Sequence, residues 1–399
     1  MINLVPLVVV LLLIAGLFRV SLIFHALYIL FGLYAIAAIW GRQTSHGVRV
    51  RRIYEPRALL GDTLTIRLEV ENHGFWPIPW LRVTDRLPVS LAAPPVFAQL
   101  VTLWPRERTT LHYELHCRQR GYYSLGPLKT SSGDVFGLRL VDREYSDTAR
   151  VTVYPKILPL EELGLPSKSP FGHLRSQQPL YEDPARVVGV REYQSGDSIR
   201  KINWKTTAAS GRLQVRKLEP AMTLQTVLLV NLSLAEFDSR DAHYASELAI
   251  VVAASLANHL VGLRQEISLI TNGRDPIADA PAAGLAMGKG RGQLMGVLEL
   301  LGRVEARAAG DFCHFLRDQR ARLPWGATLV ILTAKETDDF WETLLGLRQA
   351  GFSVVVVFCD YPSRQLYERA AERGASLGFA CRRIWKEEDA DVWRRRALV

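Results

Sequence analysis

The sequence has few cysteines and none of the short motifs that mark several common enzyme classes. Its four cysteines, Cys117, Cys313, Cys359 and Cys381, are scattered and form no CxxC pair. A disulfide framework or a cysteine-rich zinc site is therefore not expected, and the thiols are predicted to be buried and free in a reducing compartment. No HExxH, GxSxG or GxGxxG sequence occurs, so the local signatures of zinc proteases, α/β-hydrolases and dinucleotide-binding folds are absent.

Two weaker patterns also fall short of a site. Residues 284–290 (GLAMGKG) resemble a phosphate-binding loop, but the stretch is one residue short and lacks the final Ser or Thr, so a mobile loop is expected. His112, Glu114 and His116 alternate along one strand face, as zinc ligands can, yet no fourth ligand is indicated. We therefore expect no catalytic residue and predict a protein that is not an enzyme.

Apolar residues are concentrated at the N-terminus. Residues 1–41 predict a transmembrane hairpin, with helices at about 3–18 and 21–40, because one span needs ~20 apolar residues. A cleaved signal peptide is the alternative for the first helix, but a basic start and a small-residue cleavage site are missing. Arg19 occupies the turn, and four arginines follow the second helix: Arg42, Arg49, Arg51 and Arg52. The positive-inside rule then predicts a multi-pass protein of the cell membrane with cytoplasmic soluble domains.

The positive charge of the chain indicates lipid rather than nucleic acid as a partner. The formal net charge is +9, but the basic residues are dispersed, which does not favour binding of nucleic acid. Those that follow the second predicted span are well placed to contact anionic lipid headgroups.

Residues 48–155 predict a β-sandwich domain. Short alternating runs such as Leu64 to Glu71 and Thr109 to Arg118 are separated by Pro, Gly and Asn, and no long helical period occurs. Three tryptophans of this domain are expected either to fill its core or to face the membrane: Trp76, Trp80 and Trp104.

A Pro, Gly and Ser-rich connector over residues 156–184 precedes a change of pattern, and residues 221–399 alternate apolar strands with helices. This alternation predicts a doubly wound α/β domain. The expected strands are Thr226–Asn231, Glu266–Thr271, Thr328–Thr333 and Ser353–Cys359, and the expected helices are Ala242–Leu263, Gln293–Val304, Phe312–Arg322, Asp339–Gln349 and Ser363–Leu377. Because ligands bind where the carboxyl ends of such strands open into loops, residues 231–235, 272–291 and 334–338 are candidate site segments.

Residues 185–220 are dense in charge and predict a strand, a turn, a short helix and a second strand. Asp197 or Ser198 is expected to cap the helix, and Ser210-Gly211 to end it. Ile199, Ile202 and Trp204 are expected to supply one apolar side of the helix. The charged side chains either brace the two soluble domains or form an interface for a partner.

This segment also carries a resemblance to a known family. Gly189-Val-Arg-Glu-Tyr-Gln-Ser-Gly-Asp197, followed by Arg200, Ile202 and Trp204-Lys205, resembles the hallmark of the domain of unknown function 58 family. Residues 120–128 (RGYYSLGPL) and 133–138 (GDVFGL) are similar to a second recurrent segment of that family. The signature residues are Arg191, Glu192, Tyr193, Gly196, Asp197, Arg200, Trp204 and Lys205.

The resemblance implies an N-terminal membrane hairpin, a β-sandwich and a von Willebrand factor A-like domain, and a MoxR-type AAA ATPase as partner. Such domains often hold Mg²⁺ through an Asp-x-Ser-x-Ser motif. The matching residues here are Asn231, Ser233 and Ala235, with Thr333 from another loop, so the carboxylate ligand is missing. Mg²⁺ is the only cofactor left open, and we expect none to bind.

The leading hypothesis is a membrane-anchored, non-enzymatic scaffold or adaptor that works with a MoxR-type AAA ATPase in protein assembly or maturation. The alternative is an accessory factor or enzyme acting on cell-envelope substrates, which would need the soluble part to face outward.

Overall fold

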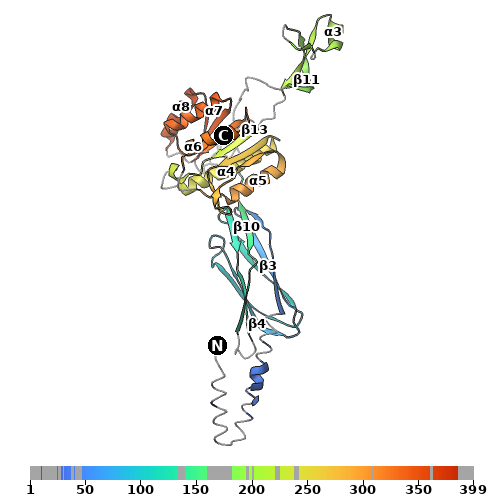
Figure 1. Ribbon diagram of the computed structural model, residues 1–399, viewed down its shortest axis with the longest axis vertical. Helices are drawn as coiled ribbons and strands as arrows, with labels where there is room; N and C mark the ends of the chain where they lie inside the picture. Colours follow the sequence, from blue (N-terminus) through green and yellow to red (C-terminus); the bar gives the residue numbers. More distant parts are fainter. Residues whose placement is uncertain are drawn as a thin grey trace, which may run out of the picture. The chain divides into compact units, whose positions relative to one another are not determined.

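The computed structural model describes residues 10, 25, 28–29, 31–36, 40, 47–133, 140–159, 182–194, 197–199, 202–220, 225–237, 242–306, 310–359 and 363–384. The chain divides into two compact units, one of Met1–Lys156 with Leu301–Arg303 and one of Ile157–Leu300 with Val304–Val399. Strands dominate the first unit, whereas helices and strands alternate in the second (Figure 1). The expected mixed α/β class with a β-rich N-terminal region is thereby confirmed.

The predicted transmembrane hairpin of residues 1–41 lies almost wholly outside the described residues. Residues 31–36, which are described, are helical and bear exposed apolar side chains. In the part of the chain that the structure describes, one helix is long and apolar enough to span a membrane, α4 (Ala242–Gly262). Its apolar window is 72% buried, so it is the core helix of the second unit, and the two-span arrangement stays a prediction.

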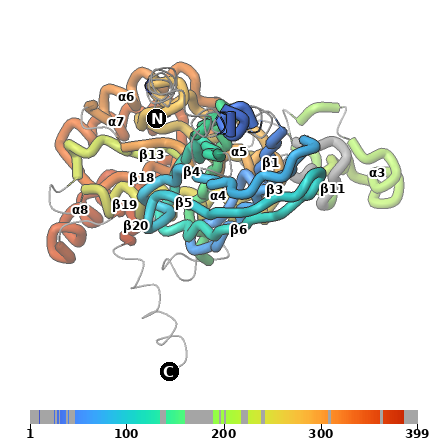
Figure 2. The backbone as a smooth tube through the Cα atoms, turned by 90° about the horizontal axis from the view of Figure 1, so that it is seen from below, coloured from blue at the N-terminus to red at the C-terminus, as the bar shows by residue number. Residues whose placement is uncertain are grey.

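In its described residues the first unit has three small sheets, ordered β1-β3-β6, β5-β4-β8-β9 and β2-β10-β7. β1, β3 and β6 run side by side in antiparallel pairs (Figure 2). The strands are β1 (Val48–Ile53), β2 (Arg57–Leu59), β3 (Thr63–Asn72), β4 (Ile78–Arg86), β5 (Val96–Leu103), β6 (Arg108–His116), β7 (Gly121–Leu125), β8 (Leu128–Gly133), β9 (Leu140–Tyr145) and β10 (Ala149–Tyr154).

Alternation along these strands builds the core of the first unit. Leu64, Ile66 and Leu68 of β3 are buried while the residues between them are exposed, as expected of a strand with one solvated face. Trp76 and Trp104 do not fill this core, because they are 41% and 68% exposed.

Arg52 does not belong to the predicted lipid-facing cluster of arginines, because its side chain points into the core. It lies on the inward face of β1, where its guanidinium forms a bidentate pair with the fully buried carboxylate of Asp85 on β4, at 2.8 Å and 2.9 Å from Nη2. The hydroxyl of Tyr113 on β6 donates to the same carboxylate at 2.8 Å. This buried pair links two sheets across the core, whereas its neighbours Arg49 and Arg51 are exposed.

The second unit is built on a six-stranded sheet with the order β17-β14-β13-β18-β19-β20. The five strands from β14 to β20 are parallel, and the edge strand β17 is antiparallel to β14. The strands are β13 (Gln225–Val230), β14 (Glu266–Thr271), β17 (Leu285–Gly288), β18 (Thr328–Thr333), β19 (Ser353–Cys359) and β20 (Ala380–Ile384). The chain starts in the middle of the sheet and adds strands on both sides, which brings two connecting loops together beside β13.

Helices cover both faces of this sheet. Val227 and Leu229 of β13 pack in one core with residues of α6 (Phe312–Gln319) and α7 (Asp338–Gln349). Leu228 and Val230 point to the opposite face, where α4 contacts the sheet. The remaining helices are α5 (Gly290–Arg303) and α8 (Arg364–Ser376).

Two predicted elements of this unit differ from the structure. The expected mobile loop of residues 284–290 is instead β17 and the start of α5, because these residues pair with β14 through Leu285 and Gly288. The helix expected over Phe312–Arg322 ends at Gln319 and continues as a single tighter turn, Arg320–Arg322.

Candidate functional site

Residues 182–220, which we call the signature module, form a hairpin with a helix in its connection. β11 (Glu182–Glu192) pairs antiparallel with β12 (Gln214–Pro220), and α3 (Trp204–Ser210) lies between them in sequence (Figure 1). Asn203 caps α3 by accepting from Thr206 N–H, so neither Asp197 nor Ser198 is the cap. Gly211 ends the helix at φ 67°, a left-handed conformation that glycine adopts without strain.

The predicted charge cluster is made of pairs within the module. Arg191 forms a bidentate ion pair with Asp197 at 2.6 Å and 2.7 Å, and the same carboxylate accepts from Gln194 N–H at 2.9 Å. Glu192 pairs with Arg212 at 3.1 Å. These described pairs hold the loop before α3 against the hairpin, and the brace between the two soluble domains stays a prediction.

The module has a very small core. Ile202 and Val215 are buried and lie opposite one another in an isolated bridge, and Thr207 Oγ1 accepts from Gln214 N–H at 3.0 Å. The apolar side expected from Ile199, Ile202 and Trp204 is therefore divided, because only Ile202 faces inward.

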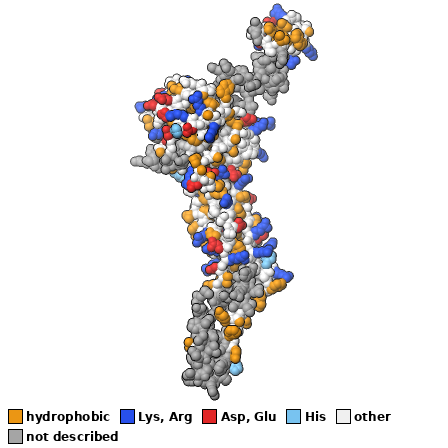
Figure 3. All heavy atoms as spheres, viewed as in Figure 1, with side chains coloured by type: hydrophobic (Ala, Val, Ile, Leu, Met, Phe, Trp, Pro, Cys, Tyr) orange, Lys and Arg blue, Asp and Glu red, His pale blue; other side chains and the backbone are white. Residues whose placement is uncertain are grey.

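Four large apolar side chains of the module remain exposed, and we call them its apolar surface. They are Val190 at 41%, Ile199 at 70%, Trp204 at 64% and Leu213 at 46% exposure. Figure 3 shows hydrophobic side chains gathered on the part of the chain that carries α3. Apolar groups that cluster beside a rim of charge are typical of a surface that another molecule covers.

A second candidate site lies at the carboxyl ends of β13 and β18, where the resemblance implies Mg²⁺. Asn231 Oδ1 accepts from Ser233 N–H at 3.0 Å, and its Nδ2 donates to Glu236 at 2.8 Å and to Thr333 Oγ1 at 3.2 Å. Asn272, which follows β14, donates to Asn231 Oδ1 at 3.1 Å. The backbone donor of Ser233 fixes which amide atom is the oxygen.

These residues do not fit a divalent cation. Both lone-pair directions of Asn231 Oδ1 are used, the hydroxyl of Ser233 donates to Gly310 O at 2.7 Å, and an N–H group points to Thr333. The carboxylate of Glu236 accepts from Asn231 on one oxygen and from Phe312 N–H on the other. Mg²⁺ would have to replace an almost complete hydrogen-bond network with mostly neutral ligands, which is unfavourable for a strongly hydrated ion.

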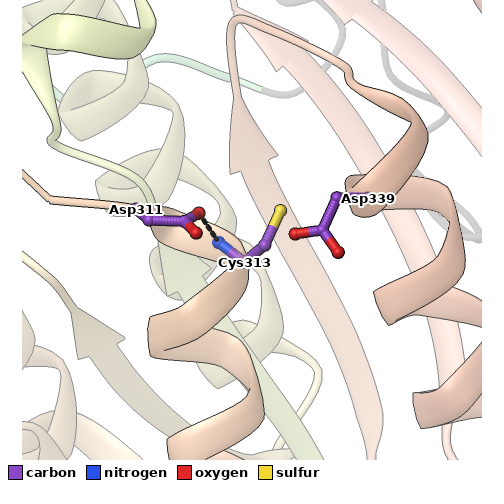
Figure 4. A group of neighbouring side chains, drawn as sticks. All are labelled: Asp311, Cys313 and Asp339. Atoms are coloured by element: carbon purple, nitrogen blue, oxygen red, sulfur yellow. Dashed lines mark hydrogen bonds between the residues drawn. The ribbon is translucent and has the colours of Figure 1, made fainter.

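A neighbouring group joins α6 and α7. The ligand atoms of Asp311, Cys313 and Asp339 lie within 4.8 Å of one another, and no other such group of three occurs in the described residues (Figure 4). Asp311 caps α6 by accepting from Cys313 N–H, and Asp339 is paired with Arg317. Burial first, and then the nearby carboxylates, raises the pKa of the Cys313 thiol to about 12. At neutral pH the group is thus a protonated thiol between two engaged carboxylates, and it lacks the thiolate that nucleophilic attack needs.

Six of the eight predicted signature residues lie in the part of the chain that the structure describes. Arg191, Glu192, Asp197, Trp204 and Lys205 share the signature module with the half-buried Tyr193, while Gly196 and Arg200 lie outside the described residues. Asn231, Ser233 and Thr333 do meet at one edge of the sheet.

Sequence reasoning missed Glu236, and it placed Asn272 in the candidate segment 272–291 without assigning it a role in this second network. A signal for Asn272 was available, because it follows its strand as Asn231 follows β13.

Comparison with known proteins gives one family and little more. Residues 189–358 match the family described as "Protein of unknown function DUF58", which confirms the resemblance over those residues. The similar segments at 120–128 and 133–138 lie outside the match. The "Uncharacterized protein YeaD" of Bacillus subtilis (strain 168) is 25% identical over 178 residues, which covers 43% of this chain and 44% of the relative. The match therefore spans less than half of that relative's length.

Similar solved structures share only a fragment of the chain. The CARDB domain of a Pyrococcus furiosus protein is 18% identical with a TM-score of 0.21, and covers 27% of this chain and 91% of that one. An alpha-2-macroglobulin from Escherichia coli is 22% identical with a TM-score of 0.23, and covers 28% and 17% of the two chains. Scores this low support no conclusion about fold or function.

Proposed function

We propose that this chain is a membrane-anchored, non-enzymatic adaptor that presents its signature module to a protein partner. The observation that carries the proposal is the apolar surface of the module, in which Trp204 and Ile199 are 64% and 70% exposed. The segment is also the start of the family match at residues 189–358. The partner expected from the family resemblance is a MoxR-type AAA ATPase, and the α/β unit would then serve as a von Willebrand factor A-like domain without a metal.

The construction of the module supports docking. An exposed Trp and an exposed Ile gain most from burial against a partner, and Trp is among the residues that most often dominate binding energy. The helix that bears Trp204 is capped at both ends by Asn203 and Gly211. A surface held in this way loses less conformational freedom on binding than a loose loop would.

The N-terminal segment supports the anchor. Tyr28, Ile29 and Phe31 are 73%, 63% and 65% exposed, and all three are helical. Apolar side chains of this size, spaced along a sequence long enough for a span, are more stable in lipid than in water.

The non-enzymatic character is supported by the chemistry of the α/β unit. Asn231, Ser233 and Thr333 are engaged with one another and with backbone groups, and the thiol of Cys313 has a raised pKa. Neither arrangement supplies an activated nucleophile with an adjacent base.

Affinity capture of the full-length protein from detergent-solubilised membranes tests the proposal. We expect the wild type to retain an AAA ATPase, and Trp204→Ala to reduce its recovery by roughly tenfold or more, as loss of a central Trp does at protein interfaces. Trp325→Ala is the matched control, because Trp325 is 67% exposed outside the module. Equal recovery of the ATPase by all three proteins would show that the module is not part of the interface. Absence of any AAA ATPase from repeated captures would reject this partner.

A further inference from the structure

One end of the first unit carries a group of exposed aromatic side chains. Phe75 is 77% exposed, Trp76 41% and Trp104 68%, and we call these three residues the aromatic rim. The guanidinium of Arg106 lies over the ring of Phe75 at 5.1 Å from its centroid. Aromatic residues of this size are usually buried in a soluble sheet protein, so three of them at one end need an explanation.

The rim is held together by one buried side chain. Asn72, which is 1% exposed, donates from Nδ2 to the carbonyl of Trp76 at 2.9 Å and to that of Trp104 at 3.1 Å. Its Oδ1 accepts from Gly74 N–H at 2.9 Å. A single amide thus ties the β3–β4 turn to the β5–β6 turn, so the rim is a fixed part of the fold.

The end of the predicted second span contacts the rim directly. The ring of Trp40 lies 5.1 Å from that of Trp76, centroid to centroid, and Trp40 Nε1 donates to Pro77 O at 3.0 Å. Residues 21–40, at ~1.5 Å per residue, have the length to cross a hydrocarbon core of ~30 Å. Trp40 therefore falls at the membrane surface, where Trp is enriched.

Charge at the same end suits a lipid surface. A groove that reaches His73, two residues before Phe75, is lined by four arginines, Arg49, Arg51, Arg108 and Arg143, and by two glutamates, Glu69 and Glu71. One of these arginines, Arg108, pairs with Glu71 at 3.1 Å. The edge of the groove at His73 is joined to Gly47 by a backbone hydrogen bond of 2.8 Å. Arginines next to interfacial aromatic rings are the combination by which proteins bind anionic headgroups.

We infer that Phe75, Trp76 and Trp104 insert into the headgroup region of the bilayer and seat the β unit on the membrane. The inference rests on the proposed membrane anchor and goes beyond it, because a hairpin alone would leave the soluble part tethered but free to turn. A protein partner on the rim is the other possible occupant. The contact with Trp40 favours lipid, since it brings the rim to the depth of the membrane surface.

Fluorescence quenching by brominated phosphatidylcholine tests this inference on the full-length protein in lipid nanodiscs. If Trp40, Trp76 and Trp104 share the lipid-quenched signal, Trp104→Phe should lower the quenched fluorescence by about a third. Trp325→Phe is the matched control, because Trp325 has almost the same exposure as Trp104, 67% against 68%, and lies in the second unit. We expect the control to leave the quenched signal unchanged.

The outcomes separate the rim from the anchor. Protein that enters nanodiscs but shows equal quenching for Trp104→Phe and wild type would overturn the lipid contact of the rim while leaving the anchor in place. Protein that does not enter nanodiscs would overturn both. Quenching at Trp104 that disappears when a captured partner is present would identify that partner as the occupant of the rim.

Discussion

At the scale of single residues, the most informative position is Arg52. From sequence it belongs to a basic cluster after a predicted span, but its place on β1 turns it toward the core, where it meets Asp85 and Tyr113. A charge is stable in such a core only because its partner and hydrogen bonds replace water. Burial, and then the charge of Asp85, also raises the pKa of the Tyr113 hydroxyl, so the phenol stays a donor at any physiological pH.

Asp85→Asn tests this buried pair. The substitution leaves Arg52 as an uncompensated buried charge, and loss of one partner of such a pair costs about 3–5 kcal/mol. We expect a large fall in the melting temperature of the detergent-purified protein, followed by circular dichroism.

The matched control for this prediction is Glu144→Gln. Glu144 pairs with Lys129 at 2.8 Å, but the two side chains are 53% and 41% exposed. Exposed pairs contribute at most ~1 kcal/mol. Equal shifts in melting temperature for the two variants would mean that the Arg52 pair does not stabilise the fold.

At the scale of elements, the loops after β13, β14 and β18 decide what the α/β unit can bind. Asn231 and Asn272 directly follow β13 and β14, Thr333 is the last residue of β18, and these side chains bond to one another. The amide of Asn231 is the centre of this network, since it makes hydrogen bonds in all directions with neutral or anionic partners. A carboxylate at this position would need a bound cation to offset its charge, whereas the neutral amide of Asn231 needs none.

Asn231→Asp should create that requirement. The new carboxylate would lie where Nδ2 now stands 2.8 Å from Glu236, so two like charges would meet in a buried place. We expect a lower melting temperature in the presence of EDTA and partial recovery in millimolar Mg²⁺. Thermal unfolding of both forms with and without Mg²⁺ is the measurement.

Asn203→Asp provides the control, because Asp caps a helix as well as Asn does. It should change neither the melting temperature nor its response to Mg²⁺. Stabilisation of the wild type itself by Mg²⁺ would contradict our conclusion that the native residues do not fit a cation.

At the scale of the whole molecule, the orientation of the soluble part decides between the adaptor and a factor that acts on cell-envelope substrates. The prediction rests on Arg42, Arg49 and Arg51 after the second span, against Arg19 in the turn. Although Arg52 is buried, more arginines still follow the second predicted span than lie in the turn, so the predicted orientation does not change.

Reporter fusions measure this orientation. Fusions after Trp40 and at the C-terminus should report the cytoplasm, because both spans return the chain to the side on which it began. A fusion after Arg19 is the control and should report the outside. Outside signals from the first two fusions would support the alternative function, and a cytoplasmic signal after Arg19 would mean that only one segment spans.

The sequence by itself determined the local features of this protein. The strands at Thr328–Thr333 and Ser353–Cys359 follow from short continuous apolar runs, because a strand that is covered on both faces buries nearly every residue. The helix that starts at Ala242 follows from a longer apolar stretch of helical length. The family signature could also be recognised from the sequence, as could the absence of a metal-binding carboxylate at position 231, because both depend only on the order of residue types.

Only the tertiary structure decided which partner each side chain has. Arg52 faces inward and Trp104 outward, and Asn272 reaches Asn231 from the neighbouring strand. These contacts depend on the pairing of segments far apart in the chain, about which local periodicity carries no information. The exposure of Trp204 and of the aromatic rim belongs to the same class, since a residue's burial is a property of everything that packs around it.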